Sequence, residues 1–204
     1  MNDEYSPAIL TEITDAIAVV RFNRPAERNP LSLDTLQELR RTTSVLFPRD
    51  DIQAVIFTGT GDIFASGANI RELAALDVEA ASRFSKLGQD LFQTIANARQ
   101  LTIAAINGYC MGGGLDLALA CDIRVAAKSA VFSHPGARLG IITGWGGTQR
   151  LPRIIGVARA LEFFATARKY SSAEALEIGL VTQVADPLLD RVVELASHKK
   201  EGGG

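Results

Sequence analysis

The sequence has 204 residues, of which 47% are hydrophobic and 22% charged, a balance typical of a globular protein with one large domain and at most a small appendage. It carries 21 lysines and arginines against 23 aspartates and glutamates, and the formal charge of −2 comes without a basic block or a long apolar run. A disordered chain is excluded, and we expect no nucleic-acid partner and no membrane partner.

Two features of the sequence indicate the cellular compartment. The start, Met1-Asn2-Asp3-Glu4, is acidic where a signal peptide would be basic, so we expect a cytoplasmic protein. Cys110 and Cys121 are the two cysteines, too few for a disulfide scaffold, and we expect both to be reduced core residues.

The first quarter of the chain predicts a hairpin, a helix and a strand. Ile9–Thr14 and Ile17–Phe22 are β-prone runs that we expect to pair antiparallel. Leucines at helical spacing follow Ser32 and predict a helix that ends near Pro48. The apolar run Ala54–Thr58 predicts a buried strand.

The rest of the chain repeats this alternation. Residues 64–69 read as irregular, and the further predicted strands are residues 101–106, 123–126, 131–132 and 180–184. Two further helices are predicted to begin near Val78 and at residues 112–114. Helices are also predicted at residues 157–168 and 188–197, and a short one begins at a capping box formed by Ser171 and Glu174. A glycine-rich loop is expected at residues 136–147. Paired short strands followed by helices predict an α/β fold of repeated ββα units.

Several common sites are excluded by their motifs. Leu117 and Gln149 stand where the last glycine of a G-x-G-x-x-G motif would be, so a dinucleotide site is not supported. His134 and His198 have no partner at metal-ligand spacing, and we expect no metal site and no prosthetic group. Ser66 lies outside a G-x-S-x-G motif, which leaves a serine hydrolase as a minor alternative.

Glycines follow two of the strand regions. Gly67-Ala68 and the triple glycine at residues 112–114 place exposed backbone amides after strands, the second at the start of a helix. Two such donors that meet at one point would form an oxyanion hole. The alternative is that these glycines only permit tight turns and close packing.

Four segments together resemble the crotonase superfamily, also called the enoyl-CoA hydratase/isomerase family. They are residues 23–31 with NRP and NPL, residues 64–70 (FASGANI), residues 105–122 (AINGYCMGGGLDLALACD) and residues 144–151 (GWGGTQRL). The resemblance implies a crotonase-like spiral of ββα units and an acyl-CoA thioester as substrate, with coenzyme A as part of that substrate. It also implies that the amides of Ala68 and Gly113 hold the thioester oxygen, and that the chain forms a homo-oligomer, a trimer or a hexamer.

The coenzyme A contacts follow from the same resemblance. It implies that the backbone from Ser66 through Asn69 to Ile70 meets the adenine end of coenzyme A. Arg24, Arg28 and Arg71 are candidate phosphate partners. Solvated surface arginines are the alternative.

The acid/base residues depart from the family pattern. Family hydratases use two glutamates, and the matching positions here hold Asp116 and Gly136. We expect Asp116 to be the general acid/base, although an aspartate there would also favour the helix dipole. His134 is the second titratable candidate, or else a structural histidine. Trp145 is expected to line the acyl pocket or to pack.

The resemblance also suggests a division of the chain. Residues 1–187 correspond to the acyl-CoA-binding core, and residues 188–204 to the start of a C-terminal helical region plus a flexible glycine tail. Crotonases continue beyond this point, so we expect that region to be truncated here. The predicted function is an enoyl-CoA hydratase or isomerase. The alternative is a non-catalytic acyl-CoA-binding or scaffold protein, favoured by Gly136.

Overall fold

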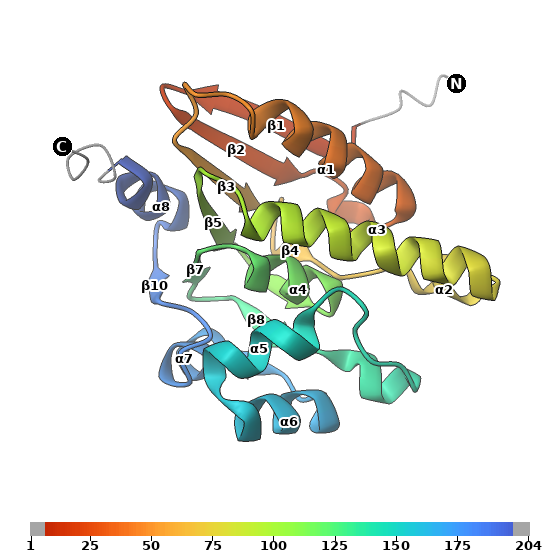
Figure 1. Ribbon diagram of the computed structural model, residues 1–204. Helices are drawn as coiled ribbons and strands as arrows, with labels where there is room; N and C mark the ends of the chain where they lie inside the picture. Colours follow the sequence, from red (N-terminus) through yellow and green to blue (C-terminus); the bar gives the residue numbers. More distant parts are fainter. Residues whose placement is uncertain (1–6, 198–204) are drawn as a thin grey trace.

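The computed structural model describes residues 7–197 (Figure 1), and the predicted glycine tail lies outside these residues. Its larger sheet has the strand order β1-β2-β3-β5-β7-β10, with β1 and β2 antiparallel and the other pairs parallel. These strands are β1 (Ile9–Thr14), β2 (Ile17–Phe22), β3 (Ala54–Thr58), β5 (Leu101–Ile106), β7 (Ile123–Ala127) and β10 (Gln183–Ala185). The predicted hairpin is confirmed residue by residue, since Ile9 pairs with Phe22 and Thr14 with Ile17.

A second sheet of short strands lies beside the first, in the order β4-β6-β8-β9. Its strands are β4 (Ile63–Ala65), β6 (Tyr109–Met111), β8 (Val131–Ser133) and β9 (Tyr170–Ser171). The chain alternates between the sheets, because β3 leads to β4, β5 to β6, and β7 to β8 before a helix returns it. The predicted spiral of ββα units is therefore confirmed.

Helices cover the sheets and make the returns. In chain order they are α1 (Leu33–Leu46), α2 (Ile70–Ala74), α3 (Val78–Ala96), α4 (Gly113–Ala120), α5 (Gly147–Ile155), α6 (Val157–Thr166), α7 (Ser172–Glu177) and α8 (Leu188–Ser197). Short 3₁₀ turns occur at Pro25–Glu27 and Pro135–Leu139. As predicted, Ser32 caps α1 by accepting a hydrogen bond from the Thr35 amide at 3.2 Å.

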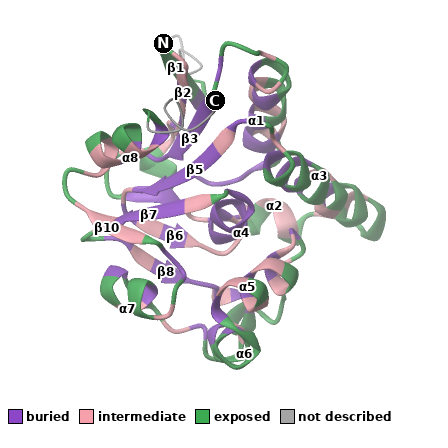
Figure 2. Ribbon diagram, turned by 60° about the vertical axis from the view of Figure 1, so that its left-hand side comes forward, coloured by how far each residue is buried: buried purple, intermediate pink, exposed green. Residues whose placement is uncertain are grey.

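The two faces of the large sheet enter different cores. Val55 and Phe57 of β3 belong to the main core with α1, α3 and α4, whereas Ala54 and Ile56 lie in a smaller cluster that Val192 of α8 completes. This alternation is the period of two expected of a strand with both faces buried. Figure 2 shows α4 as the buried helix of the molecule, and residues 114–120 are all buried.

Some predicted elements were wrong in their extent. The predicted helix at residues 157–168 ends at Thr166, because Ala167 adopts a left-handed conformation with φ of 49°. The predicted strand at residues 180–184 begins only at Gln183, since the amides of Leu180 and Val181 bond to the Ala175 carbonyl in a turn. Strands β4, β6 and β9 and helices α2 and α5 were not predicted at all. The prediction that residues 64–69 are irregular was wrong for residues 64–65, which belong to β4.

The remaining global predictions concern the cysteines and membrane insertion. Cys110 and Cys121 are both unpaired and buried. Burial raises the pKa of Cys110 well above its usual value and that of Cys121 to about 12, so both are unreactive thiols at neutral pH. None of the helices between Pro7 and Ser197 combines the length and the apolar character that crossing a bilayer requires.

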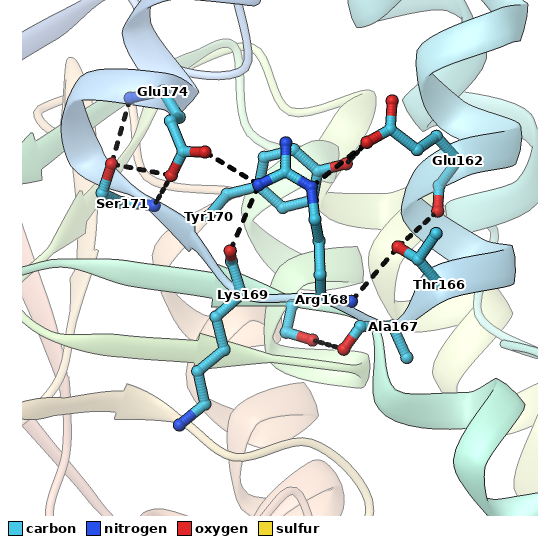
Figure 3. Close-up of polar contacts among 9 residues, drawn as sticks. Glu162, Thr166, Ala167, Arg168, Lys169, Tyr170, Ser171 and Glu174 are labelled. Carbon is cyan, nitrogen blue, oxygen red and sulfur yellow. Dashed lines mark hydrogen bonds and ion pairs between the residues drawn. The ribbon is translucent and has the colours of Figure 1, made fainter.

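A polar cluster joins α6 to α7 through β9 (Figure 3). Arg168 lies between Glu162 and Glu174, at 3.1 Å and 2.8 Å, and stacks on the Tyr170 ring at 3.6 Å. The Ser171 amide donates to the Glu174 carboxylate at 2.8 Å, and the Glu174 amide donates to the Ser171 hydroxyl at 3.3 Å; these two bonds form the predicted capping box. These interactions lower the pKa of Glu174 from 4.5 to about 2, and the hydrogen bond from the Ser171 amide contributes most, followed by the hydrogen bond from Arg168.

Glu174→Gln tests the contribution of this cluster to stability. Because the folded-state pKa of Glu174 lies below its ordinary value, its stabilisation is complete above pH 4.5 and is lost as the pH falls from 4.5 to about 2. We expect the variant to be less stable than the parent in urea denaturation at neutral pH, with a difference that shrinks over that acidic range. Glu177→Gln, an exposed position in the same helix, is the control. A difference that is constant with pH would contradict the assignment.

Candidate active site

Three loops emerge side by side from the carboxyl ends of β4, β6 and β8. These strands are neighbours and run parallel, with Ala65 paired to Cys110 and Met111 paired to Ser133. The segments that follow them therefore meet at one edge of the small sheet. They begin with Ser66, Gly112 and His134, and each contains residues that the sequence predicted to be functional.

The two predicted amide donors are close together. A β-carbon on Gly113 would stand 3.5 Å from the Ala68 nitrogen, and one on Gly67 would stand 2.8 Å from the Gly113 nitrogen. Only glycine allows this approach, and Gly67 also has φ of +91°. Within residues 7–197, no carbonyl or side chain accepts a hydrogen bond from either amide. Both donors are thus available to a ligand.

Both amides border a cavity of about 580 Å³. Its walls are mainly apolar and come from α2, α3 and the loop before α5: Ile70, Leu73, Phe84, Leu139, Ile142 and Trp145. Asp116, His134 and Thr143 supply polar groups. A mostly apolar cavity with a few convergent polar groups is typical of a site for a small molecule.

The Asp116 carboxylate lies in the first turn of α4 and is fully buried, at 0% exposure. Its Oδ1 is 3.3 Å from the Nε2 of His134, and its Oδ2 accepts a hydrogen bond from the Thr143 hydroxyl. Gly147 makes room for it, because a β-carbon there would be 2.1 Å from Oδ1. A buried carboxylate needs such partners, since an unpaired one would be strongly penalised.

His134 follows β8 directly and is also buried, at 5% exposure. Its ring packs edge-on against Phe164 of α6, with centroids 5.1 Å apart. The two titratable candidates of the sequence analysis are therefore one hydrogen-bonded pair.

Gly136 lies in the 3₁₀ turn after His134. A β-carbon at Gly136 would stand 2.5 Å from the Ile141 carbonyl oxygen, and the Ile141 amide donates to the Gly136 carbonyl at 3.0 Å. No side chain fits at this position unless the loop moves.

Trp145 both packs and lines the cavity, so the two interpretations of the sequence are compatible. Its ring makes edge contacts with Phe84 and Phe92, with centroids 5.2 and 5.7 Å apart. β-carbons on Gly88 and Gly113 would each meet the indole at 2.4 Å. These two glycines therefore set where the ring lies.

The residues predicted to contact coenzyme A do not all lie at the cavity. Ser66, Ala68 and Ile70 border the cavity. Asn69 caps α2, accepting a hydrogen bond from the Arg71 amide at 3.0 Å. The structure does not bring the three candidate arginines to the cavity wall within the described part of the chain. Arg24 is paired with Asp34 at 2.8 Å, while Arg28 and Arg71 are exposed on neighbouring segments.

Sequence reasoning missed Thr143 and Phe164. Thr143 lies in the glycine-rich loop, where no motif marks it, and Phe164 is one of several apolar residues of α6. Their roles come from contacts with Asp116 and His134 across the fold, which a pattern of residues along the chain does not contain.

Comparisons with known proteins show which proteins the chain is similar to. Residues 12–202 match the sequence profile described as enoyl-CoA hydratase/isomerase. The chain is 40% identical to a crotonyl-CoA hydratase of Syntrophomonas wolfei, over 93% of this chain and 74% of the relative, and 38% identical to a short-chain-enoyl-CoA hydratase of Clostridium acetobutylicum, with the same coverage. The crystal structure of an enoyl-CoA hydratase from Bacillus anthracis superimposes with a TM-score of 0.92 at 37% identity, covering 96% of this chain and 78% of that one.

Gly88→Ala tests the packing of Trp145. Alanine improves helix propensity by up to about 1 kcal/mol, but overpacking a rigid ring costs about 1–3 kcal/mol, so we expect a net loss of stability. Because Trp145 is the only tryptophan, its fluorescence reports the displacement directly, and the emission maximum should shift to the red. Thr94→Ala, on the exposed face of α3, is the control. An unchanged spectrum together with higher stability would contradict the packing role.

Proposed function

Because the chain belongs to the enoyl-CoA hydratase/isomerase family of the crotonase superfamily, we propose that it is an acyl-CoA enzyme whose oxyanion hole is formed by the amides of Ala68 and Gly113. One observation carries the proposal. Two neighbouring amides without a protein acceptor border an apolar cavity that also holds a buried carboxylate. The arrangement combines a donor pair for a carbonyl oxygen, space for an acyl chain and a group for proton transfer.

The chemistry supported by this arrangement is enolate formation. Removal of a proton next to a thioester, or addition of a nucleophile one carbon further on, places negative charge on the thioester oxygen. Donors that are already fixed in the fold stabilise this charge without reorganisation, and one such donor typically contributes about 3–4 kcal/mol to lowering the barrier. Backbone donors are set by the path of the chain, and here that path depends on Gly67 and on the start of α4.

The acid/base unit is the hydrogen-bonded pair of Asp116 and His134. Both border the cavity on the side of Gly113, and no second carboxylate is available at Gly136. Concerted addition of water by two carboxylates is thus disfavoured relative to reactions that need a single base, such as the shift of a double bond. The absence of a side chain at Gly136 also favours the second candidate function, an acyl-CoA-binding protein without turnover.

Coenzyme A is proposed as part of the substrate, with no prosthetic group. Its adenine end would contact the backbone from Ser66 to Ile70, which lies at the cavity wall beside the exposed Arg71. Arg28 and Arg24 remain candidates for its phosphates. We also propose the division into a core of residues 1–187 and the start of a helical region from residue 188, and assembly into a trimer or hexamer, which light scattering of the purified protein measures.

Binding and turnover of acyl-CoA thioesters test the function. We expect crotonyl-CoA to raise the melting temperature and to change the fluorescence of Trp145, which lines the cavity. On a panel of enoyl, hydroxyacyl and malonyl thioesters, Asp116→Asn should lower turnover by at least about tenfold with affinity nearly unchanged. Asp50→Asn, an exposed position outside the cavity, is the control. Binding without turnover of any thioester would favour the second candidate, and no binding would refute both.

Ala68→Pro tests the oxyanion hole, because proline removes the amide donor. Loss of one donor should lower kcat by about 10²–10³-fold, with a smaller change in KM. Ala68→Gly keeps the amide and should retain most of the activity. Circular dichroism and thermal unfolding would confirm that both variants are folded. Equal activity of the two variants would show that the Ala68 amide does not act in catalysis.

A further inference from the structure

The polar groups in the cavity form one hydrogen-bonded chain, His134–Asp116–Thr143. We propose that His134 is the group that exchanges protons with the substrate, that Asp116 is its fixed internal partner, and that Thr143 is the positioning residue that holds Asp116. This assignment rests on the proposed function and divides the roles within its acid/base unit.

The protonation of His134 follows from its partner. Asp116 as a carboxylate can only accept hydrogen bonds, so the Nε2 of His134, 3.3 Å from Oδ1, must carry the proton. In the neutral imidazole the lone pair then belongs to Nδ1. Among the described residues, no protein group forms a hydrogen bond with Nδ1. The free nitrogen therefore has the electronic state that a general base needs.

Asp116 itself is poorly placed to meet a substrate. None of its surface is accessible, and both of its oxygens have protein partners, His134 on Oδ1 and the Thr143 hydroxyl on Oδ2. Thr143 is fixed in turn, because its Oγ1 accepts a hydrogen bond from the Trp145 amide at 3.4 Å. A carboxylate held at both oxygens orients the imidazole and stabilises the imidazolium formed when Nδ1 takes a proton.

The glycines of the two loops leave room for this chain. The Nδ1 of His134 is 3.8 Å from the point where a β-carbon on Gly136 would stand, which is an ordinary van der Waals distance, so the imidazole lies directly beside this glycine. A β-carbon on Gly147 would stand 2.1 Å from Asp116 Oδ1 and 2.8 Å from the Thr143 methyl group. His134 is thus the titratable side chain that lies next to Gly136.

The step assigned to His134 is a proton transfer. The C–H bond next to the thioester breaks, its proton moves to Nδ1, and its electron pair moves into the enolate, whose oxygen the Ala68 and Gly113 amides bind. Return of the proton to the same carbon restores the substrate. When the acyl chain carries a neighbouring double bond, the enolate is conjugated with it, and return of the proton to the far carbon of that double bond shifts the double bond. Exchange of the Nδ1 proton with D₂O before return labels the substrate with deuterium.

The test is deuterium exchange next to the thioester of butyryl-CoA, followed by NMR in D₂O. Wild type should exchange, and His134→Gln should reduce the rate by about 10²-fold or more, the usual contribution of a general base. Thr143→Val is nearly isosteric and should reduce the rate by about tenfold, the effect of one hydrogen bond to a charged group. In both variants butyryl-CoA affinity should stay within about threefold of wild type, since neither change removes an oxyanion donor.

Thr143→Ser provides the decisive comparison, because it restores the hydroxyl without the methyl group. It should recover most of the exchange rate, whereas a role of Thr143 in packing alone would leave serine as impaired as valine or more so. Thr94→Val, on the exposed face of α3, controls for the same substitution elsewhere. Should Thr143→Val fail to fold, the exchange rates of Thr143→Ser and His134→Gln, each compared with wild type, still test the proposed roles.

The possible results distinguish a failure of the proposed function from a failure of the roles assigned to His134 and Thr143. If wild type neither binds butyryl-CoA nor exchanges its protons, the proposed function fails. If wild type exchanges and His134→Gln exchanges at the same rate, the function stands and the role of His134 is refuted. If His134→Gln is slow while Thr143→Val equals wild type, the positioning role of Thr143 is refuted.

Discussion

The site depends on the parallel pairing of three strands that are only three residues long. Strands β6 and β8 pair in continuous register, and β4 pairs with β6 through a register shift between Ile63 and Ala65. The three strands still run parallel, so the segments that begin with Ser66, Gly112 and His134 leave the sheet at one edge. The Gly112 amide donates to the Ser133 carbonyl at 3.0 Å, which extends the pairing past the end of the strands. No single segment contains the site. It exists because the spiral returns the chain to this edge at every turn.

Close approach of backbone to backbone is the second requirement, and it explains the glycines better than turn formation does. A β-carbon on Gly114 would stand 2.4 Å from the Ala65 carbonyl oxygen, and one on Gly67 would stand 2.9 Å from the Met111 carbonyl oxygen. The start of α4 is thus pressed against the end of β4. The two amides are neighbours because the glycines between these segments have no β-carbon, which allows the two backbones to approach closely.

Some elements of the fold could be predicted because their sequence patterns are strong. Ala54–Thr58 is an uninterrupted apolar run, and Ser171 with Glu174 has the spacing of a capping box. Strand β6 (Tyr109–Met111) could not be predicted, since three residues show no periodicity. Helix α5 was missed because Gly146, Gly147 and Pro152 are residues that normally argue against a helix. Family motifs mark Ala68, Gly113 and Asp116, and the structure brings these three residues to one cavity. Thr143 was missed because only the fold brings its hydroxyl to Asp116.

The glycine at position 136 also bears on the reaction proposed for the cavity. Water addition by a carboxylate pair needs two groups that can each give or take a proton. The atom closest to a β-carbon at position 136 is the Ile141 carbonyl oxygen, at 2.5 Å, and a carbonyl can accept a hydrogen bond from water but cannot exchange a proton with it. Under the proposed function, proton exchange in the cavity is therefore assigned to His134 and Asp116, which share one hydrogen bond. A single unit of this kind suits a reaction in which one base removes a proton and returns it.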